Sequence, residues 1–335
     1  DALAERFTAD IAVRSAKPVL DMYFRQCYLD NFLRGGYPFV FYGGAKNKVV
    51  HLFSRKHGDP ERDYNQFSIA AEYYSQGDGN FRDVLQNRRC DVLFHPEIDD
   101  FDIEQFYSLV QIDGYTPMYI KPSTFTVLPE CRDGLGEWLS RAVCEKAGEE
   151  VLSLLSEPFT PGSLTNALFE RRISLRVSHA EFLQRVLACC SQEFETGTEK
   201  VGDYIDQWDY LLDLIDCYRR IYPDRMERLL YDKDTYRYFD TDLCVRPRSE
   251  KYFLSGDTPK QLDAFFVDTE KYKRGYRIDG TNWLKDAHGN ICTTNLVGKL
   301  FTLAINKMAL LDPCQMGIEM EANRPGWNDA CNGLP

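Results

Sequence analysis

Near its C-terminus the chain reads Gly326-Trp327-Asn328-Asp329-Ala330-Cys331-Asn332-Gly333. This stretch places an indole ring, two side-chain amides and a carboxylate between two glycines, a composition that suits a loop lining a polar cleft. A flat apolar ring beside amides and an acid can hold a sugar and protonate a glycosidic oxygen. From composition alone, an ordinary polar loop after a helix is the simpler interpretation.

Residues 326–333 resemble the Trp-Asn-Asp-Gly-x-Asn signature of the inverting glycoside phosphorylases, the clan that contains cellobiose phosphorylase and the β-1,3- and β-1,2-glucan phosphorylases. In that family the Asp after Trp-Asn is the general acid. The resemblance therefore implies that Asp329 is the catalytic residue and that Trp327 and Asn328 shape the pocket for the donor sugar.

A second stretch reads Gly79-Asn80-Phe81-Arg82-Asp83-Val84-Leu85-Gln86-Asn87. It is similar to the family's Gly-Tyr-Arg-Asp-x-x-Gln-Asp segment, whose Arg-Asp helps to bind the transferred sugar. The resemblance implies the same role for Arg82, Asp83 and Gln86. Two motifs that occur in the family's order, far apart in the chain, are more specific than either motif alone.

The match departs from the family pattern at three places. Ala330 stands where the family usually has Gly, Pro325-Gly326 precede the Trp where an acid is common, and Asn87 replaces an acid. We therefore interpret the chain as a divergent member of the clan.

The family fold is a toroid of six helical hairpins, (α/α)6, whose loop ends build the active site. The resemblance implies that residues 1–230 are its first hairpins, 231–290 an irregular, aromatic-rich insertion, and 291–335 a helix with the active-site loop. Because the chain stops inside that loop, we expect it to be a segment of a longer protein. Apolar faces left uncovered in half a toroid would cause aggregation or homodimerisation.

Apolar periodicity independently predicts a mainly α fold with short β elements. There is no alternation of strands and helices of the kind that builds a parallel sheet, and no Gly-Lys-Ser/Thr phosphate loop. The pattern predicts helices over residues 18–34, 59–74, 99–113, 135–155, 204–222 and 293–311, strands over 39–42, 49–53 and 124–128, and a tight turn over 286–290.

Ser178-His179-Ala180-Glu181 predicts a capping box at the start of a further helix that runs through Ser191. His179 lies in the first turn of that helix, so we interpret it as a surface or capping residue and not as a catalytic one.

Net charge and cysteine spacing limit the kinds of partner and cofactor that we expect for this chain. A net charge of −12 over 335 residues argues against nucleic acid and anionic membranes, which need a basic surface. The 11 cysteines show no Cys-x-x-Cys pair and the five histidines no metal-binding spacing, so we expect reduced thiols, a cytoplasmic location and no metal. No apolar run reaches the roughly 18 residues that span a bilayer.

The predicted reaction is phosphorolysis of a β-glucosidic oligosaccharide with inversion, with inorganic phosphate as co-substrate and no other cofactor. An acid that works near neutral pH needs a raised pKa, which partial burial near Glu319 or Glu321 would give Asp329.

Two alternatives stay open. One is an inverting glycoside hydrolase of similar fold, with its base at Glu321 or beyond Pro335, and the other is a non-catalytic carbohydrate-binding module. The family's phosphate-binding residues follow the acid, so an inactive segment of an active parent is also open.

Overall fold

The computed structural model describes residues 2–54, 69–144, 147–194, 196–202, 205–241, 248–261, 283–309, 311 and 315. Helix accounts for 52% of these residues, and most strands pair in short two-stranded antiparallel sheets. The prediction of a mainly α fold is therefore confirmed. No toroid is shown by this part of the chain, and the six-hairpin arrangement stays a prediction.

The chain forms two units. Unit 1 combines Asp1–Ile98 with Tyr119–Thr196, and unit 2 combines Asp99–Met118 with Gly197–Pro335. The polypeptide thus leaves unit 1 once and returns to it before it enters unit 2 for the remainder. The predicted division into residues 1–230, 231–290 and 291–335 stays a prediction, because much of 231–290 and most of 310–335 lie outside the described residues.

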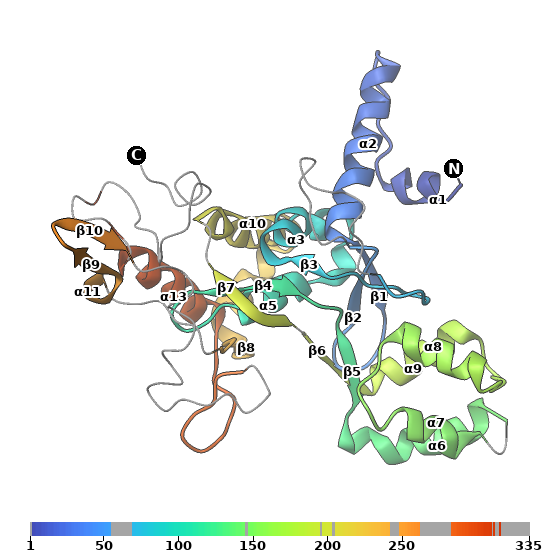
Figure 1. The fold of residues 1–335 in the computed structure, drawn as a ribbon. Helices are drawn as coiled ribbons and strands as arrows, with labels where there is room; N and C mark the ends of the chain where they lie inside the picture. Colours follow the sequence, from blue (N-terminus) through green and yellow to red (C-terminus); the bar gives the residue numbers. More distant parts are fainter. Residues whose placement is uncertain are drawn as a thin grey trace. The chain divides into compact units, whose positions relative to one another are not determined.

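Unit 1 combines helices with short antiparallel strand pairs (Figure 1). Its helices are α1 (Ala2–Phe7), η1 (Thr8–Asp10), α2 (Pro18–Gly35), α3 (Phe81–Arg88), α4 (Asp91–Phe94), η2 (Pro96–Ile98), η3 (Pro129–Cys131), α6 (Arg132–Ala142), α7 (Gly148–Leu154), α8 (Pro161–Glu170) and α9 (His179–Ala188). Its strands are β1 (Tyr37–Phe41), β2 (Lys48–Leu52), β3 (Gly79–Asn80), β5 (Thr124–Val127) and β6 (Cys190–Glu193), while β4 (Thr116–Ile120) runs in from unit 2.

The strands predicted at 39–42 and 49–53 are confirmed as β1 and β2, which form an antiparallel hairpin with Val40 opposite Val49. Gly43 and Gly44 in its connection have φ of 123° and 74°, a region that side chains other than glycine rarely adopt. The strand predicted at 124–128 is confirmed as β5, which pairs antiparallel with β6.

The main hydrophobic core of unit 1 lies where β2 and β5 meet α6 to α9. Successive side chains of a strand point to opposite faces, so Val50 and Leu52 face the same side of β2 and both join this core. The fully buried aromatic side chains in it are Phe125 and Phe182.

Two predicted helices differ from the structure. The described end of the 59–74 prediction is not helical, because Ile69 pairs with Gly77 and the carbonyl of Ser75 accepts from the Phe53 N–H in bridges beside β2. The 135–155 prediction splits into α6 and α7, because extended Val143 leaves the helix and pairs with Leu175. Pairing of the backbone with distant segments outweighed local periodicity at both places.

Unit 2 contains α5 (Phe101–Ser108), α10 (Ile205–Ile221), η4 (Pro223–Arg225), η5 (Arg228–Asp232), α11 (Arg248–Lys251) and α13 (Leu296–Ala309). Its strands are β7 (Thr196–Gly202), β8 (Tyr236–Arg237), β9 (Tyr252–Ser255), β10 (Thr258–Gln261) and β11 (Thr293–Thr294).

Several predicted elements are confirmed within small shifts of their ends. The predictions at 18–34, 204–222 and 293–311 correspond to α2, α10 and α13, whereas the helix predicted at 99–113 is confirmed only as the shorter α5, which ends at Ser108. The turn at 286–290 is confirmed by a hydrogen bond from the Asp286 N–H to the Asn290 carbonyl, 2.9 Å, beside a bridge between Lys285 and Ile291. None of the helices described has both the length and the apolar character needed to cross a bilayer.

Two helical glycines should respond to alanine with opposite signs. A Cβ at Gly162 of α8 would meet the Tyr73 carbonyl oxygen at 2.2 Å, whereas a Cβ at Gly134 of α6 meets nothing within 4 Å. We expect Gly162→Ala to destabilise the protein by about 1–3 kcal/mol and Gly134→Ala to stabilise it by up to about 1 kcal/mol. Urea unfolding of both variants measures this, and equal shifts for the two would contradict the packing of α8.

Candidate functional site

The second sequence motif forms the capped start of α3. The side-chain oxygen of Asn80 accepts hydrogen bonds from the backbone N–H groups of Arg82, 3.1 Å, and Asp83, 3.4 Å. Asn80 itself is extended and pairs with Tyr119 of β4. Because these bonds satisfy amides that a helix start otherwise leaves open, Arg82 and Asp83 occupy a fixed position.

The three predicted sugar-binding residues on α3 differ in exposure. Asp83 is buried, Arg82 is half-buried and Gln86 is exposed. Asn87, one turn after Asp83, donates from Nδ2 to the Asp83 carbonyl at 2.6 Å and is also buried. Arg82 and Gln86, four residues apart, therefore share a more open side of the helix than Asp83 does.

The first motif lies outside the described residues. Trp327, Asn328 and the predicted acid Asp329 belong to residues 316–335, as do Glu319 and Glu321. Their approach to Arg82 and Asp83 stays a prediction.

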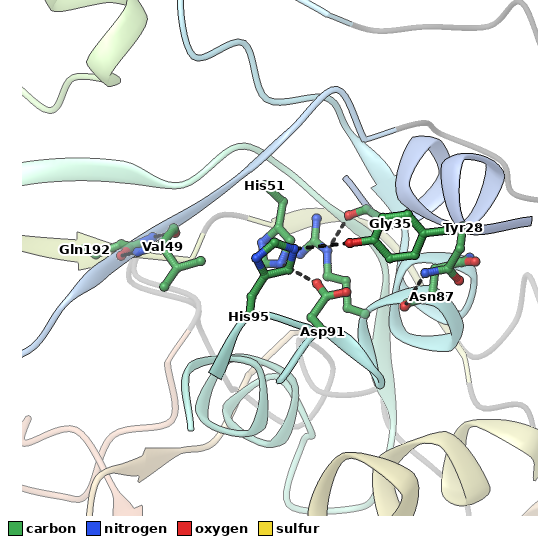
Figure 2. Close-up of polar contacts among 10 residues, drawn as sticks. Tyr28, Gly35, Val49, His51, Asn87, Asp91, His95 and Gln192 are labelled. Atoms are coloured by element: carbon green, nitrogen blue, oxygen red, sulfur yellow. Dashed lines mark hydrogen bonds and ion pairs between the residues drawn. The ribbon is translucent and has the colours of Figure 1, made fainter. Parts of the chain in front are cut away.

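Immediately after the motif, unit 1 holds a buried polar cluster made of Tyr28, His51, Arg88, Asp91 and His95 (Figure 2). The His51 Nε2 and the Asp91 Oδ2 lie 3.2 Å apart. The Tyr28 hydroxyl and the His95 Nε2 lie 3.4 Å apart. The cluster joins three helices to β2, because its members come from α2, β2, α3, α4 and the residue after α4.

The end of α2 anchors this cluster. The Arg88 Nε donates to the Gly35 carbonyl at 2.6 Å, and the Asn31 Nδ2 donates to the Asn87 carbonyl at 3.3 Å (Figure 2). Carbonyls at a helix C-terminus lack partners within the helix and carry partial negative charge, so a guanidinium binds there favourably. Gly36 then turns the chain into β1 with φ of 88°.

His51 is neutral in this setting. Burial lowers its pKa well below the ordinary value, and the nearby positive charges of Arg88 and His95 lower it further. A neutral imidazole donates from one ring nitrogen, and a carboxylate only accepts, so the Nε2–H of His51 donates to Asp91. With His51 4% exposed, the pair positions β2 against α4.

Histidine and aspartate are also metal-ligand types. His51 and Asp91 supply two of the three or four protein ligands that a zinc site takes. The expectation of no metal stays a prediction.

A cleft of about 510 Å³ opens elsewhere in unit 1. It lies between the β1–β2 connection, α6 and one side of α9. Its lining includes Tyr42, Trp138, Glu181, Gln184 and Arg185.

The start of α9 shows the Ser178 half of the predicted capping box. The Glu181 N–H donates to the Ser178 Oγ at 3.2 Å, although the helix ends at Ala188 and not at Ser191, because Cys190 begins β6. His179 is partly buried beside Phe169, with ring centroids 6.3 Å apart, and burial lowers its pKa.

Unit 2 contains a buried lysine. Lys299 of α13 is fully buried, its Nζ donates to the Val110 carbonyl at 2.9 Å, and it lies 3.4 Å from the ring centre of Tyr238. Burial lowers the pKa of Lys299 well below its ordinary value. Without exposure to solvent, this amine serves packing.

No protein-family model matches the chain, and no curated protein matches it either.

Sequence reasoning missed the polar cluster and the cleft. Arg88 and Asp91 follow the second motif closely, which was the available signal for two of the five cluster residues. His51, the partner of Asp91, and Tyr28, the partner of His95, lie in separate segments, and no local pattern pairs them.

Removing the N-cap of α3 should destabilise the helix start that carries Arg82 and Asp83. We expect Asn80→Ala to cost about 1 kcal/mol of folding stability, and Asn80→Asp to cost much less because Asp also caps helices well. Urea unfolding of the two variants compares them. An unchanged midpoint for Asn80→Ala would show that the cap does not hold Arg82 and Asp83 in place.

The depressed pKa of His51 predicts a pH dependence of stability. Its folded pKa lies below the unfolded value, so the unfolded chain binds more protons between the two. The contribution of His51 to the free energy of unfolding is fully present above about pH 6.5. It is lost as the pH falls, by about 1.4 kcal/mol for each pH unit that separates the folded pKa from the unfolded one. Thermal unfolding from pH 7.5 to 5 should show a weaker slope for His51→Gln than for the wild type. His288→Gln, which alters an exposed turn residue, should leave the slope unchanged.

Proposed function

We propose that this chain acts on carbohydrate, by phosphorolysis of a β-glucosidic oligosaccharide with inversion at the anomeric carbon. The observation that carries the proposal is the occurrence of two motifs in the family's order, residues 79–87 and 326–333. The capped start of α3 supports it, because a sugar-binding pair needs a rigid platform.

In this mechanism Asp329 is protonated and donates its proton to the glycosidic oxygen as the bond breaks. Inorganic phosphate attacks the anomeric carbon from the opposite face and leaves with the sugar as a sugar 1-phosphate. Trp327 and Asn328 shape the donor pocket, and Arg82, Asp83 and Gln86 bind the hydroxyls of the transferred sugar.

A phosphorylase needs one carboxylic acid where an inverting hydrolase needs two carboxyl groups. Phosphate is already a nucleophile, so the protein only has to bind and orient it. The six-hairpin toroid would gather the loops for this task, with an oligosaccharide and phosphate as partners, no nucleic acid or membrane, and a reducing cytoplasm as the location.

The second candidate is an inverting hydrolase of similar fold. The third is a non-catalytic carbohydrate-binding protein, which the cleft of unit 1 favours because it combines aromatic and polar side chains.

Product analysis with and without phosphate tests the proposal. We expect β-linked glucose oligosaccharides to yield sugar 1-phosphate only when phosphate is present. Asp329→Asn should lower turnover by about 10²–10⁴-fold, because it removes the general acid. Asp257→Asn, in the exposed turn between β9 and β10, is the matched control and should retain activity.

Other products would decide against phosphorolysis. Free reducing sugar without phosphate identifies the hydrolase, and binding without conversion identifies the binding protein. Near-normal turnover of Asp329→Asn would show that Asp329 is not the general acid.

A further inference from the structure

We propose that the cleft between the β1–β2 connection, α6 and α9 binds a neutral oligosaccharide, separately from the residues of the two motifs. The inference extends the proposed function and rests on it only for the class of sugar. The cleft of about 510 Å³ is wide enough for more than an isolated water, and all its lining residues belong to unit 1.

Two aromatic side chains line the cleft from different elements. Tyr42 follows β1 and is 51% exposed, so much of its ring is open to a ligand. Trp138 of α6 is half-buried and packs against Phe182 with ring centres 5.9 Å apart, which fixes its indole. Aromatic rings with a polar tip offer the apolar plate on which the C–H face of a pyranose stacks.

One side of α9 supplies the polar lining. Ala180, Gln184 and Ala188 are spaced four residues apart, and Glu181 and Arg185 form the adjacent row. The two alanines leave room between the longer side chains. Within the described part of the chain, the side chains of Glu181, Gln184 and Arg185 make no hydrogen bond or ion pair, so their donors and acceptors are available to hydroxyl groups.

The connection between β1 and β2 closes the cleft at the end of α9. A Cβ at Gly44 would meet the Ala188 carbonyl oxygen at 2.6 Å, and its φ of 74° already favours glycine. The close approach of this backbone to α9 therefore holds Tyr42 beside the polar row.

The charges of the lining favour a neutral ligand. Glu181 and Arg185 contribute one negative and one positive group to the same side of α9. An anion such as phosphate would meet the carboxylate, and a cation would meet the guanidinium. A polyol can instead donate to Glu181 and accept from Arg185 and Gln184, as the hydroxyls of a glucose oligosaccharide do.

Calorimetric titration of the full chain with β-1,4- and β-1,3-linked glucose tetrasaccharides tests the site. We expect Tyr42→Ala to weaken binding about tenfold and Tyr42→Phe to retain most of it, because the ring provides the stacking surface. Gln184→Ala should weaken binding about threefold or more through a lost hydrogen bond, at an exposed position where folding is not at risk. Tyr252→Ala, an exposed tyrosine of unit 2, is the matched control and should bind as the wild type does.

The outcomes separate this site from the proposed reaction. Binding that depends on Tyr42 and Gln184 and persists in Asp329→Asn supports the cleft, even if no sugar 1-phosphate forms in any assay. If sugar 1-phosphate forms but Tyr42→Ala and Gln184→Ala bind sugar as the wild type does, the cleft is not the binding site, while the proposed reaction is supported. Absence of measurable binding at millimolar concentrations of both sugars would also overturn it.

Discussion

Burial of β2 on both of its faces is the constraint on which the arrangement of unit 1 depends. Val50 and Leu52 point into the helical core, while Val49 and His51 point to the other side and are equally buried. The Gln192 side chain donates to the Val49 carbonyl at 2.6 Å and so links β2 to β6 through an amide (Figure 2). A strand held from both sides cannot shift its register without exposing one set of side chains.

Strand β2 therefore helps to position both the polar cluster and the cleft. On one side, His51 and Asp91 join it to α4, next to the helix that carries Arg82 and Asp83. At its start, the glycine connection to β1 brings Tyr42 against α9 and so forms the cleft. The polar cluster makes unit 1 sensitive to substitution, because a buried histidine and carboxylate stabilise the fold only while each has its partner.

Elements with strong local signals were predictable from the sequence. Apolar spacing located α2, α10 and α13, and Ser178 with Glu181 located the start of α9, since periodicity and capping depend on neighbours in the chain. Failures came where distant backbone segments pair. Val143 leaves a helical pattern to pair with Leu175, and the segment that ends the 59–74 prediction is followed by Ser75, whose carbonyl accepts from the Phe53 N–H. Of the predicted site, the platform of Arg82 and Asp83 is visible as a capped helix, whereas Asp329 lies outside the described residues and its approach to that helix stays a prediction.

The division of unit 1 into two stretches of chain governs how the protein can fold during synthesis. Asp1–Ile98 contain β2, but the helices that cover its apolar side and the strand that carries Gln192 arrive only within Tyr119–Thr196. The β1–β2 hairpin is therefore synthesised before the segments that cover Val50 and Leu52. Apolar side chains that stay uncovered during synthesis expose the nascent chain to aggregation until the second stretch of unit 1 is made.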